Sequence, residues 1–406
     1  MSDLNVKMIE DLHFARVYAR KPVTIVRGLG AYVYDANGKE YVDCAGGYGT
    51  CIVGHAHPKV VAAISEQARN LIACHGSTYN DARARLLSKL ASIVPSGMSR
   101  FFLSNSGAEA VECAIKLTRK STNRRQIIAF KGAYHGKTHG ALSATWDAKY
   151  RKSFEPLVPD FTHVPFANAD AAKATISKQT AAIVVEPIQG EGGIRVPPPD
   201  WMPLLRDLAH DNGALLIADE IQSGFGRTGR MLASEHFDVV PDILCLGKGV
   251  ASGLPLGVTA ASEQIMGSFS LGEHTSTFGG NPVVCASAAA TIKVLQEERL
   301  TENAEHIGAY FKRRLVDLKR DLRILREVRG MGLMLGVEMR FDVHKILEAA
   351  LENGVLMLDA GRNILRFLPP LVLTQAGVDR VIDSLGPMLE KEELERLPDQ
   401  TTEINA

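Results

Sequence analysis

The sequence predicts an α/β fold in which a mainly parallel β-sheet is followed by a smaller α+β domain. From about residue 100 to residue 261, short apolar runs alternate with helical stretches, which is typical of a parallel sheet covered by helices on both faces. After residue 285 this alternation ends, and long helical stretches are mixed with short strands. The apolar runs are Phe101–Leu103, Ile127–Phe130, Ile183–Val185, Leu215–Ala218, Ile243–Leu246 and Leu256–Ala261.

The first fifty residues predict a helix, an arm and a hairpin. Residues 1–30 are expected to form a helix and then an extended segment. Residues 31–35 and 41–43 predict the strands of a β-hairpin, because Asn37-Gly38 between them is typical of a tight turn. A glycine-rich loop around Tyr48 follows. Such loops allow a ligand to approach closely, so Tyr48 is a candidate substrate contact.

The C-terminal part predicts an α+β unit of its own. Helices are expected from residue 286, at 343–353 and at 375–389, and strands within 328–338, 355–358 and 363–367. With 406 residues the chain is long enough for two or three domains. We therefore expect an N-terminal segment at 1–50 that packs with the small domain, a large domain at 51–300 and a small domain at 301–406.

The composition argues against several classes of protein. Lys and Arg total 46 and Asp and Glu total 46, so no net charge attracts the chain to nucleic acid or to an anionic membrane. Six cysteines without a CxxC pair are expected to be reduced thiols of a cytoplasmic protein. We see neither an apolar run of about eighteen residues, as a membrane-spanning helix needs, nor the apolar segment of a secretion signal.

The residues that follow the apolar runs carry the candidate chemistry, because ligands bind beyond the carboxyl ends of parallel strands. Lys248 comes just after the run at 243–246. Burial disfavours a charged ammonium group, so a lysine at the mouth of a buried strand is a candidate nucleophile or Schiff-base former. The alternative is an ordinary lysine that is solvated just beyond the strand.

A second strand exit predicts an anion site. Ser106, with Glu109 three residues later, has the spacing of a capping box that opens a helix. The free N–H groups and the dipole of a helix start both favour an anion, so this position suits a phosphate. The alternative is a well-capped helix without a ligand.

Aromatic and acidic side chains follow two further apolar runs. Tyr134 and His135 lie between glycines and can present an aromatic face to a planar ligand. His135 and His139 are four residues apart but lack an evident third ligand, so we expect no metal site. Glu186 and Glu191 follow another run and are either an acid–base pair or ion-pair partners.

Asp219 completes a set of parts that suits one cofactor. It ends the run at 215–218, and a partly buried carboxylate requires a cationic partner. The protonated nitrogen of a pyridinium ring would serve, and so would Arg227. These strand exits together offer an anion site for a phosphate, an aromatic face for a ring, an acid for a ring nitrogen and a buried amine. Pyridoxal phosphate needs all four.

These stretches together resemble the class III aminotransferases, which use pyridoxal phosphate. The resemblance implies fold type I, with a mainly parallel seven-stranded sheet in the large domain. It runs in family order over most of the chain and extends into the small domain at Arg366–Leu371. The matching stretches are Ser106–Ala110, Tyr134–Gly136, Glu186–Gly193, Asp219–Gln222, Gly226–Gly229, Leu246–Gly249 and Thr275–Pro282.

The resemblance implies a ping-pong transfer of a terminal amino group to 2-oxoglutarate. Lys248 would bind the cofactor covalently and shuttle a proton, and Asp219 would keep the pyridine nitrogen protonated. Arg366 would bind the α-carboxylate of 2-oxoglutarate, and Glu191 would pair with Arg366 when an ω-amine is the donor. The other implied cofactor contacts are Ser106, Gly107 and Ala108 at the phosphate, Tyr134 on the ring with His135 and Glu186 nearby, Gln222 at the phenolic oxygen, and Thr277 at the phosphate of the neighbouring subunit of a homodimer.

The donor is the open question within this family. The length and the stretch at 326–336 are most similar to acetylornithine aminotransferases, and among these to enzymes acting on lysine or ornithine bound to an acidic amino-group carrier protein. Lys137 departs from that pattern, because such enzymes usually have an arginine there, whose bidentate fork grips the distal carboxylate. Putrescine aminotransferases carry a lysine at this position, and 4-aminobutyrate aminotransferase is a third alternative.

Functions other than transamination are compatible with the same fold. A mutase acting on glutamate semialdehyde is disfavoured by Arg366 with Glu191, since this pair suits a reaction with two alternating substrates. A decarboxylase and a cofactor-binding protein without activity are further alternatives. The binding protein is disfavoured because Lys248 and Asp219 are both present.

Overall fold

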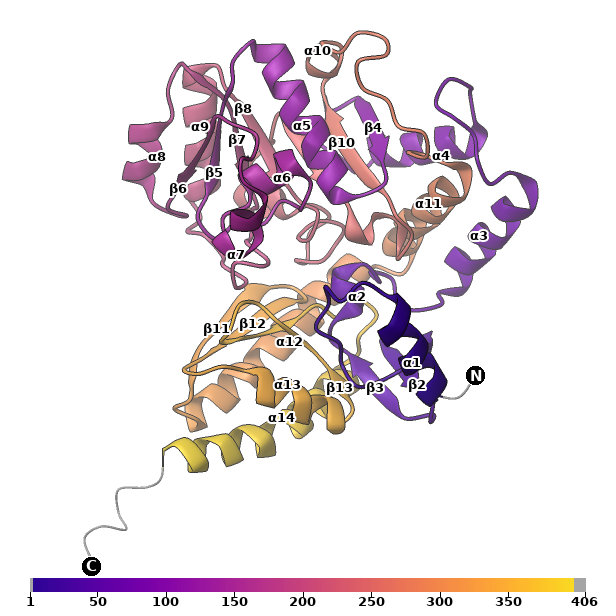
Figure 1. Ribbon diagram of the computed structural model, residues 1–406, viewed down its shortest axis with the longest axis vertical. Coiled ribbons are helices and arrows are strands. Elements are labelled where there is room, and N and C mark those ends of the chain that lie inside the picture. Colours follow the sequence, from indigo (N-terminus) through magenta and orange to yellow (C-terminus); the bar gives the residue numbers. More distant parts are fainter. Residues whose placement is uncertain (1–2, 398–406) are drawn as a thin grey trace, which may run out of the picture.

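A seven-stranded β-sheet lies at the centre of the large domain in the computed structural model, which describes residues 3–397 (Figure 1). The strand order is β4-β10-β9-β8-β7-β5-β6, and all neighbours are parallel except that β10 runs antiparallel to both β4 and β9. The strands are β4 (Arg100–Ser104), β5 (Gln126–Phe130), β6 (Phe161–Val164), β7 (Thr180–Val185), β8 (Leu215–Asp219), β9 (Ile243–Leu246) and β10 (Gly257–Ala261). The predicted sheet is thus confirmed.

Helices cover both faces of this sheet (Figure 1). They are α3 (Pro58–Asn70), α4 (Asp81–Ala91), α5 (Gly107–Thr122), α6 (His139–Ala144), α7 (Ala148–Arg151), α8 (Ala169–Thr175), α9 (Trp201–Asn212), α10 (Glu263–Met266) and α11 (Pro282–Glu297), with 3₁₀ turns η1 (Lys152–Phe154), η2 (Ala233–Phe237) and η3 (Lys248–Ala251). Ile127 and Ala129 of β5 pack with α5 on one face, whereas Ile128 and Phe130 pack with α9 on the other. Because both faces are buried, the strands are continuous apolar runs.

The sequence pattern missed one strand and one helix break in this domain. Strand β6 lies at the edge of the sheet, and three of its four residues are partly exposed. Thr162 and His163 interrupt its apolar character, so no apolar run marks it. The helical pattern over 58–95 corresponds to two helices, α3 and α4, separated by residues 71–80.

A four-stranded antiparallel sheet forms the small domain, with the order β11-β12-β15-β14. Its strands are β11 (Leu325–Met331), β12 (Met334–Met339), β14 (Leu358–Asp359) and β15 (Ile364–Phe367), and its helices are α12 (Leu300–Asp321), α13 (His344–Glu352) and α14 (Gln375–Arg396). Helix α14 continues past the predicted end at residue 389. The alternation of helix and strand seen in the large domain is absent from residues 300–397, as the sequence predicted.

The N-terminal segment shares a sheet with the C-terminal part of the chain. Helix α1 (Asp3–His13) and strands β1 (Ile25–Leu29), β2 (Tyr32–Asp35) and β3 (Glu40–Asp43) precede α2 (Gly46–Gly49), and β13 (Val355–Leu356) pairs in parallel with β3. This pairing agrees with the expected packing of the N-terminal segment, while the domain boundaries at 50 and 300 stay a prediction. Within residues 3–397, no helix combines the length and apolarity needed to cross a membrane.

Candidate active site

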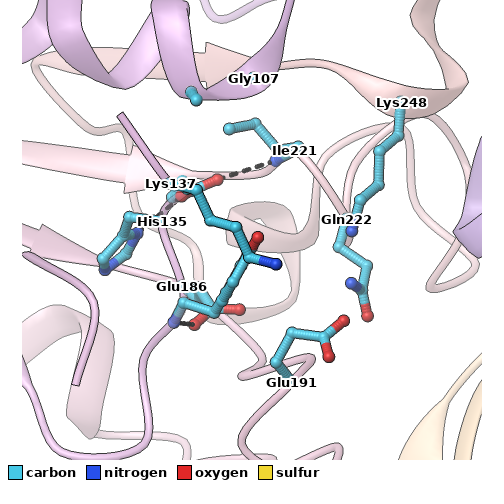
Figure 2. Close-up of a pocket in the computed structure, with 12 residues that line it drawn as sticks. Gly107, His135, Lys137, Glu186, Glu191, Ile221, Gln222 and Lys248 are labelled. Atoms are coloured by element: carbon cyan, nitrogen blue, oxygen red, sulfur yellow. Dashed lines mark hydrogen bonds and ion pairs between the residues drawn. The ribbon is translucent and has the colours of Figure 1, made fainter. Parts of the chain in front are cut away.

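The ends of several central strands open into one cavity of about 310 Å³. Figure 2 shows Lys248 extending toward Gln222 and Glu191 in this cavity, with His135 on the opposite side of the view. Parallel strands end at the same edge of a sheet, which is why residues far apart in the sequence meet here. The cavity is lined by Gly107, Ala108, Tyr134, His135, Gly136, Lys137, Glu186, Glu191, Asp219, Ile221, Gln222 and Lys248.

Lys248 begins the turn η3, two residues after β9 ends at Leu246. Its backbone φ is +45°, an uncommon conformation for a residue that carries a side chain. Burial lowers the pKa of its amine to about 8, although the carboxylates of Glu191 and Glu186 oppose this fall. Lys248 is therefore a desolvated amine within the cavity rather than a solvated lysine beyond the strand.

Asp219 occupies the last position of β8 and is 4% exposed. Its Oδ2 lies 2.7 Å from Nδ1 of His135, and its Oδ1 accepts a hydrogen bond from the Ile221 backbone N–H at 3.1 Å. Burial lowers the pKa of His135, but the hydrogen bond to Asp219 and its negative charge outweigh this effect and leave the pKa raised. His135 is thus the protein group that pairs with Asp219.

The suggestion that Arg227 is a partner of Asp219 is wrong. The Nη1 of Arg227 instead donates to the backbone carbonyl oxygens of Leu333, at 3.1 Å, and Pro369. Arg227 therefore ties the large domain to the small domain, and the side chain beside Asp219, that of His135, comes from a different strand exit.

The two glutamates have different partners. Glu186 accepts hydrogen bonds from the backbone N–H groups of Tyr134, at 3.0 Å, and Gly190, at 2.9 Å. Burial raises the pKa of Glu186 to about 7. Glu191 forms an ion pair with Arg366. This arrangement favours the ion-pair interpretation of Glu191 over an acid–base pair with Glu186.

The start of helix α5 borders the cavity at Gly107 and Ala108. The Oγ of Ser106 accepts the Glu109 N–H at 3.2 Å, but the Glu109 carboxylate accepts instead from the backbone and side chain of Asn105, so half of the predicted capping box forms. A Cβ atom on Gly107 would lie 2.8 Å from the Ile221 side chain, so this close packing requires glycine. Free N–H groups at such a start favour an anion.

Arg366, on β15, brings the small domain into the site. Its side chain is 1% exposed and that of Glu191 is 22% exposed. Burial raises the pKa of Glu191, but the charges of Arg366 and Lys248 outweigh burial and hold the pKa below its usual value. The Tyr48 ring centroid is 5.8 Å from the Arg366 Cζ, and the Gln222 Oε1 is 3.5 Å from its Nη1. The predicted substrate contacts around Arg366 therefore lie together.

The remaining predicted residues lie at or beyond the edge of the cavity. Lys137 is exposed, and its Nζ lies 5.2 Å from the ring centroid of Tyr150. The Tyr150 ring packs edge-on against Tyr134 at a centroid distance of 5.5 Å. Ser106 and Thr277 are exposed and do not line the cavity.

Two residues that line the cavity, Gly136 and Ile221, and one that packs beside it, Tyr150, were not among the predicted site residues. Ile221 lines the cavity and lies against Gly107. Its position between Asp219 and Gln222 was the available signal, since an apolar residue inside a polar strand exit suits the face of a ring. For Tyr150 there was no such signal, because its place beside Lys137 depends on the fold of α7.

A family model described as aminotransferase class-III matches residues 14–389. The acetylornithine aminotransferase of Methanopyrus kandleri is 43% identical over 388 residues, which cover 95% of this chain and 99% of that protein. The chain belongs to the class III aminotransferases.

Two further relatives of this aminotransferase illustrate the breadth of the family. A Pyrobaculum aerophilum protein, provisionally named LysW-aminoadipate semialdehyde/glutamate semialdehyde transaminase, is 42% identical and covers 93% of this chain and 98% of its own length. The crystal structure of Toxoplasma gondii ornithine aminotransferase superposes with a TM-score of 0.93 at 34% identity, covering 98% of this chain and 97% of that one.

Membership of this family confirms the predicted enzyme class and cofactor: the chain is a pyridoxal-phosphate-dependent aminotransferase of fold type I. The residues of the cavity fit that cofactor, because an amine at Lys248, a buried carboxylate at Asp219 and a helix start at Gly107 line one space. Among residues 3–397, no group of three or more His, Cys, Asp and Glu side chains is arranged to hold a metal ion.

Proposed function

We propose that this aminotransferase moves the terminal amino group of acetylornithine, or of lysine or ornithine bound to an amino-group carrier protein, to 2-oxoglutarate by a ping-pong reaction. The observation that carries this proposal is the Glu191–Arg366 ion pair beside Lys248. A buried arginine needs a counter-ion, and either Glu191 or a substrate carboxylate can fill that place. One site can then bind first the amine donor and afterwards 2-oxoglutarate. The relatives named for acetylornithine and for LysW-bound semialdehydes support the same donors, which belong to arginine and lysine biosynthesis.

The cofactor contacts follow from the cavity. When bound, pyridoxal phosphate supplies an electron sink for the substrate carbon that carries the amine. Asp219 would hold a proton on the ring nitrogen, and His135, whose Nδ1 lies 2.7 Å from the Asp219 Oδ2, fixes the orientation of that carboxylate. Among the cavity residues, Gly107 and Ala108 would contact the phosphate, Tyr134 the ring face and Gln222 the phenolic oxygen, and Glu186 accepts the backbone N–H of Tyr134. Ser106 lies outside the cavity and caps the helix whose start would hold the phosphate.

Lys248 has two tasks in this proposal. Its Nζ would hold the cofactor, and as a neutral amine it would accept the proton of the amine-bearing substrate carbon. A pKa of about 8 supports the second task, because roughly a tenth of such amines are neutral at pH 7 and ready to accept a proton. A solvated lysine would be almost fully protonated at that pH.

Glu191 and Arg366 select between the two substrates. With an ω-amine donor, Glu191 neutralises Arg366, and the carbon chain of the donor passes beside the pair. With 2-oxoglutarate, the planar guanidinium of Arg366 binds the α-carboxylate and Glu191 is displaced. Tyr48, whose ring lies 5.8 Å from the Arg366 Cζ, covers this position.

Lys137 binds the distal part of the donor. It lies at the exposed edge of the cavity, where a single ammonium group can contact a carboxylate but cannot form the fork of an arginine. Lys149 contacts the same tyrosine ring as Lys137, with its Nζ 4.7 Å from the Tyr150 ring centroid. Two lysines at this edge also suit an acidic carrier protein.

The active form is a homodimer in the cytoplasm. Thr277 lies on an exposed loop away from its own cavity, as a residue that completes the phosphate site of the partner must. Leu271 and Phe278 on this loop are 105% and 65% exposed, and Tyr79 is 104% exposed, which is typical of a surface covered by a second copy. All six cysteines are unpaired, which agrees with a reducing compartment.

A donor panel with 2-oxoglutarate tests the proposed donor. The panel contains acetylornithine, ornithine, free lysine, carrier-bound lysine, 4-aminobutyrate and putrescine. We expect the highest kcat/KM for acetylornithine or the carrier-bound donor. Strong activity with putrescine, and none with donors that bear a distal carboxylate, would refute this donor and favour the diamine alternative, which the lysine at position 137 also permits.

The variant Lys137→Arg tests the distal contact. It should raise kcat/KM for carboxylate-bearing donors about tenfold and leave putrescine unchanged, because a fork adds a second hydrogen bond to a carboxylate. Lys173→Arg, on the exposed side of α8, is the matched control. An unchanged donor preference in Lys137→Arg would mean that Lys137 does not contact the donor.

A further inference from the structure

Arg329, Gly336 and Arg366 lie directly opposite one another on three neighbouring strands of the small domain. Gly336 of β12 pairs with Arg329 of β11 on one side and with Arg366 of β15 on the other. Residues paired in this way place their side chains on the same face of a sheet. The two arginines therefore flank a position that has no side chain. We call these three residues the arginine row.

The loop that carries Glu191 contacts both ends of the arginine row. Gln189 and Arg195 close this loop with two backbone hydrogen bonds of 3.0 Å, one in each direction. Glu191 reaches one end of the row through its ion pair with the substrate-binding arginine. At the other end, the carbonyl oxygen of Gly193 accepts a hydrogen bond of 2.8 Å from the Nε of Arg329.

Ile194 fills the gap in the middle of the row. It is fully buried, and a Cβ atom on Gly336 would lie 3.0 Å from the Ile194 Cβ and 3.1 Å from its Cγ1. That spacing is tighter than ordinary van der Waals contact, so the loop can settle this closely on the sheet because position 336 is glycine. The loop is thus held at three successive points of one row.

Arg329 is itself held rigidly. Its Nη1 lies 2.5 Å from Oε2 of Glu327 and 2.6 Å from Oε2 of Glu338, and its side chain is 13% exposed. Two carboxylates thus fix the outer edge of the planar guanidinium, while its Nε remains directed at Gly193. Charge-assisted bonds of this kind are stronger than neutral ones and fix direction as well as distance.

We propose that Arg329 is a positioning residue that, through Gly193, fixes Glu191 against Arg366 and so sets the relative reactivity toward ω-amine donors and 2-oxoglutarate. This proposal rests on the function proposed above. Arg366 belongs to the small-domain sheet, whereas Glu191 belongs to a loop of the large domain. Arg329 binds the loop of Glu191 to the same three-strand segment that carries Arg366. The distance between Glu191 and Arg366 therefore does not depend on how the domains move.

The expected effect is selective because the two substrates use Glu191 differently. An ω-amine donor needs Glu191 in contact with Arg366, so a loosened loop weakens that half-reaction. 2-Oxoglutarate displaces Glu191, so the same loosening does not impair its binding. A residue with a merely structural role would affect both half-reactions alike.

The test compares Arg329→Met with Arg326→Met in the holoenzyme. Arg326 is on the same strand, and its Nη1 lies 3.2 Å from the other carboxylate oxygen of Glu338, but its side chain is 65% exposed. Single-turnover absorbance measurements give kcat/KM for each half-reaction separately. We expect Arg329→Met to lower the donor value about tenfold and to change the 2-oxoglutarate value less than about twofold. Arg326→Met should change neither beyond about twofold.

In these assays the proposal is overturned if Arg329→Met changes neither half-reaction, if it lowers both equally, or if Arg326→Met shows the same selective fall. If Arg329→Met does not fold, Gly336→Ala takes its place, because the added Cβ pushes Ile194 away and should produce the same selective loss. An unselective loss in Gly336→Ala counts against the proposal equally.

A crystal structure of the Arg329→Met holoenzyme tests the role of Arg329 independently of the proposed donor. The Glu191–Arg366 contact should be broken or lengthened beyond hydrogen-bond distance, and an unchanged contact would overturn the proposed role of Arg329. Failure of the wild-type enzyme to use any ω-amine donor would instead refute the proposed function, and the structural comparison would still decide whether Arg329 positions Glu191.

Discussion

Replacing Lys248 by methionine should stabilise the cofactor-free protein at neutral pH. Burial lowers the pKa of Lys248 from an ordinary value of 10.5 to about 8. At about 1.36 kcal/mol per pKa unit, keeping this amine protonated in the folded protein costs about 3 kcal/mol. Methionine has a similar shape without the charge. Lys248 is half-buried, so solvent screens part of this cost, and we expect a gain of about 2 kcal/mol in the free energy of unfolding.

The gain should depend on pH in one direction. Below pH 8 the amine is protonated in both the folded and the unfolded protein, so the full cost is present. As the pH rises from about 8 toward 10.5, the folded protein loses the proton first and the cost disappears. Urea unfolding at equal protein concentration should therefore give a difference of about 2 kcal/mol at pH 7 and less than about 1 kcal/mol at pH 10.

Lys173→Met is the control for this experiment. Lys173 is exposed on helix α8, so its replacement should give no stabilisation that fades with rising pH. If Lys248→Met is no more stable than the wild type at pH 7, or if the difference is the same at both pH values, burial of the protonated Lys248 amine does not destabilise the folded protein.

Three further substitutions test the site. Asp219→Asn should lower kcat at least about 100-fold in single-turnover assays, since an amide cannot hold the proton of the ring nitrogen; a fall below tenfold would contradict that role. Glu191→Gln should lower kcat/KM for the ω-amine donor by roughly 10- to 100-fold, because Arg366 loses a charge-assisted partner, and should spare the 2-oxoglutarate half-reaction; equal losses would argue against substrate selection. Thr277→Ala should weaken cofactor binding about tenfold in a titration of the cofactor-free enzyme, and unchanged affinity would exclude Thr277 from the phosphate site of either subunit.

Local patterns predicted those parts of the site that a single segment determines. The run at 243–246 marked a buried strand, and Lys248 at its exit lines the cavity. Ser106 was recognised as a helix cap because its spacing to Glu109 is local. In both places the neighbouring residues in sequence are also the neighbours in space, so apolar runs and capping positions carry the information.

Contacts between distant segments were beyond such patterns. Arg227 was considered as a protein partner of Asp219, whereas the side chain that contacts Asp219 is His135, 84 residues away. The hydrogen bond from Arg329 to Gly193 joins residues 136 positions apart, and neither residue type predicts it. Such pairs depend on which strand exits become neighbours, and sheet order is a property of the whole chain.

The pairing of β3 with β13 has a consequence for synthesis of the chain. Val42 of β3 lies opposite Val355 of β13. The N-terminal sheet can therefore be completed only after about 300 further residues have been synthesised. At about 5 to 20 residues per second, a ribosome needs roughly 15 to 60 seconds to supply them. During that interval one edge of β3 has unpaired backbone groups, which invite pairing with other chains. The nascent chain should therefore be most prone to aggregation through β3 until Val355 has been synthesised.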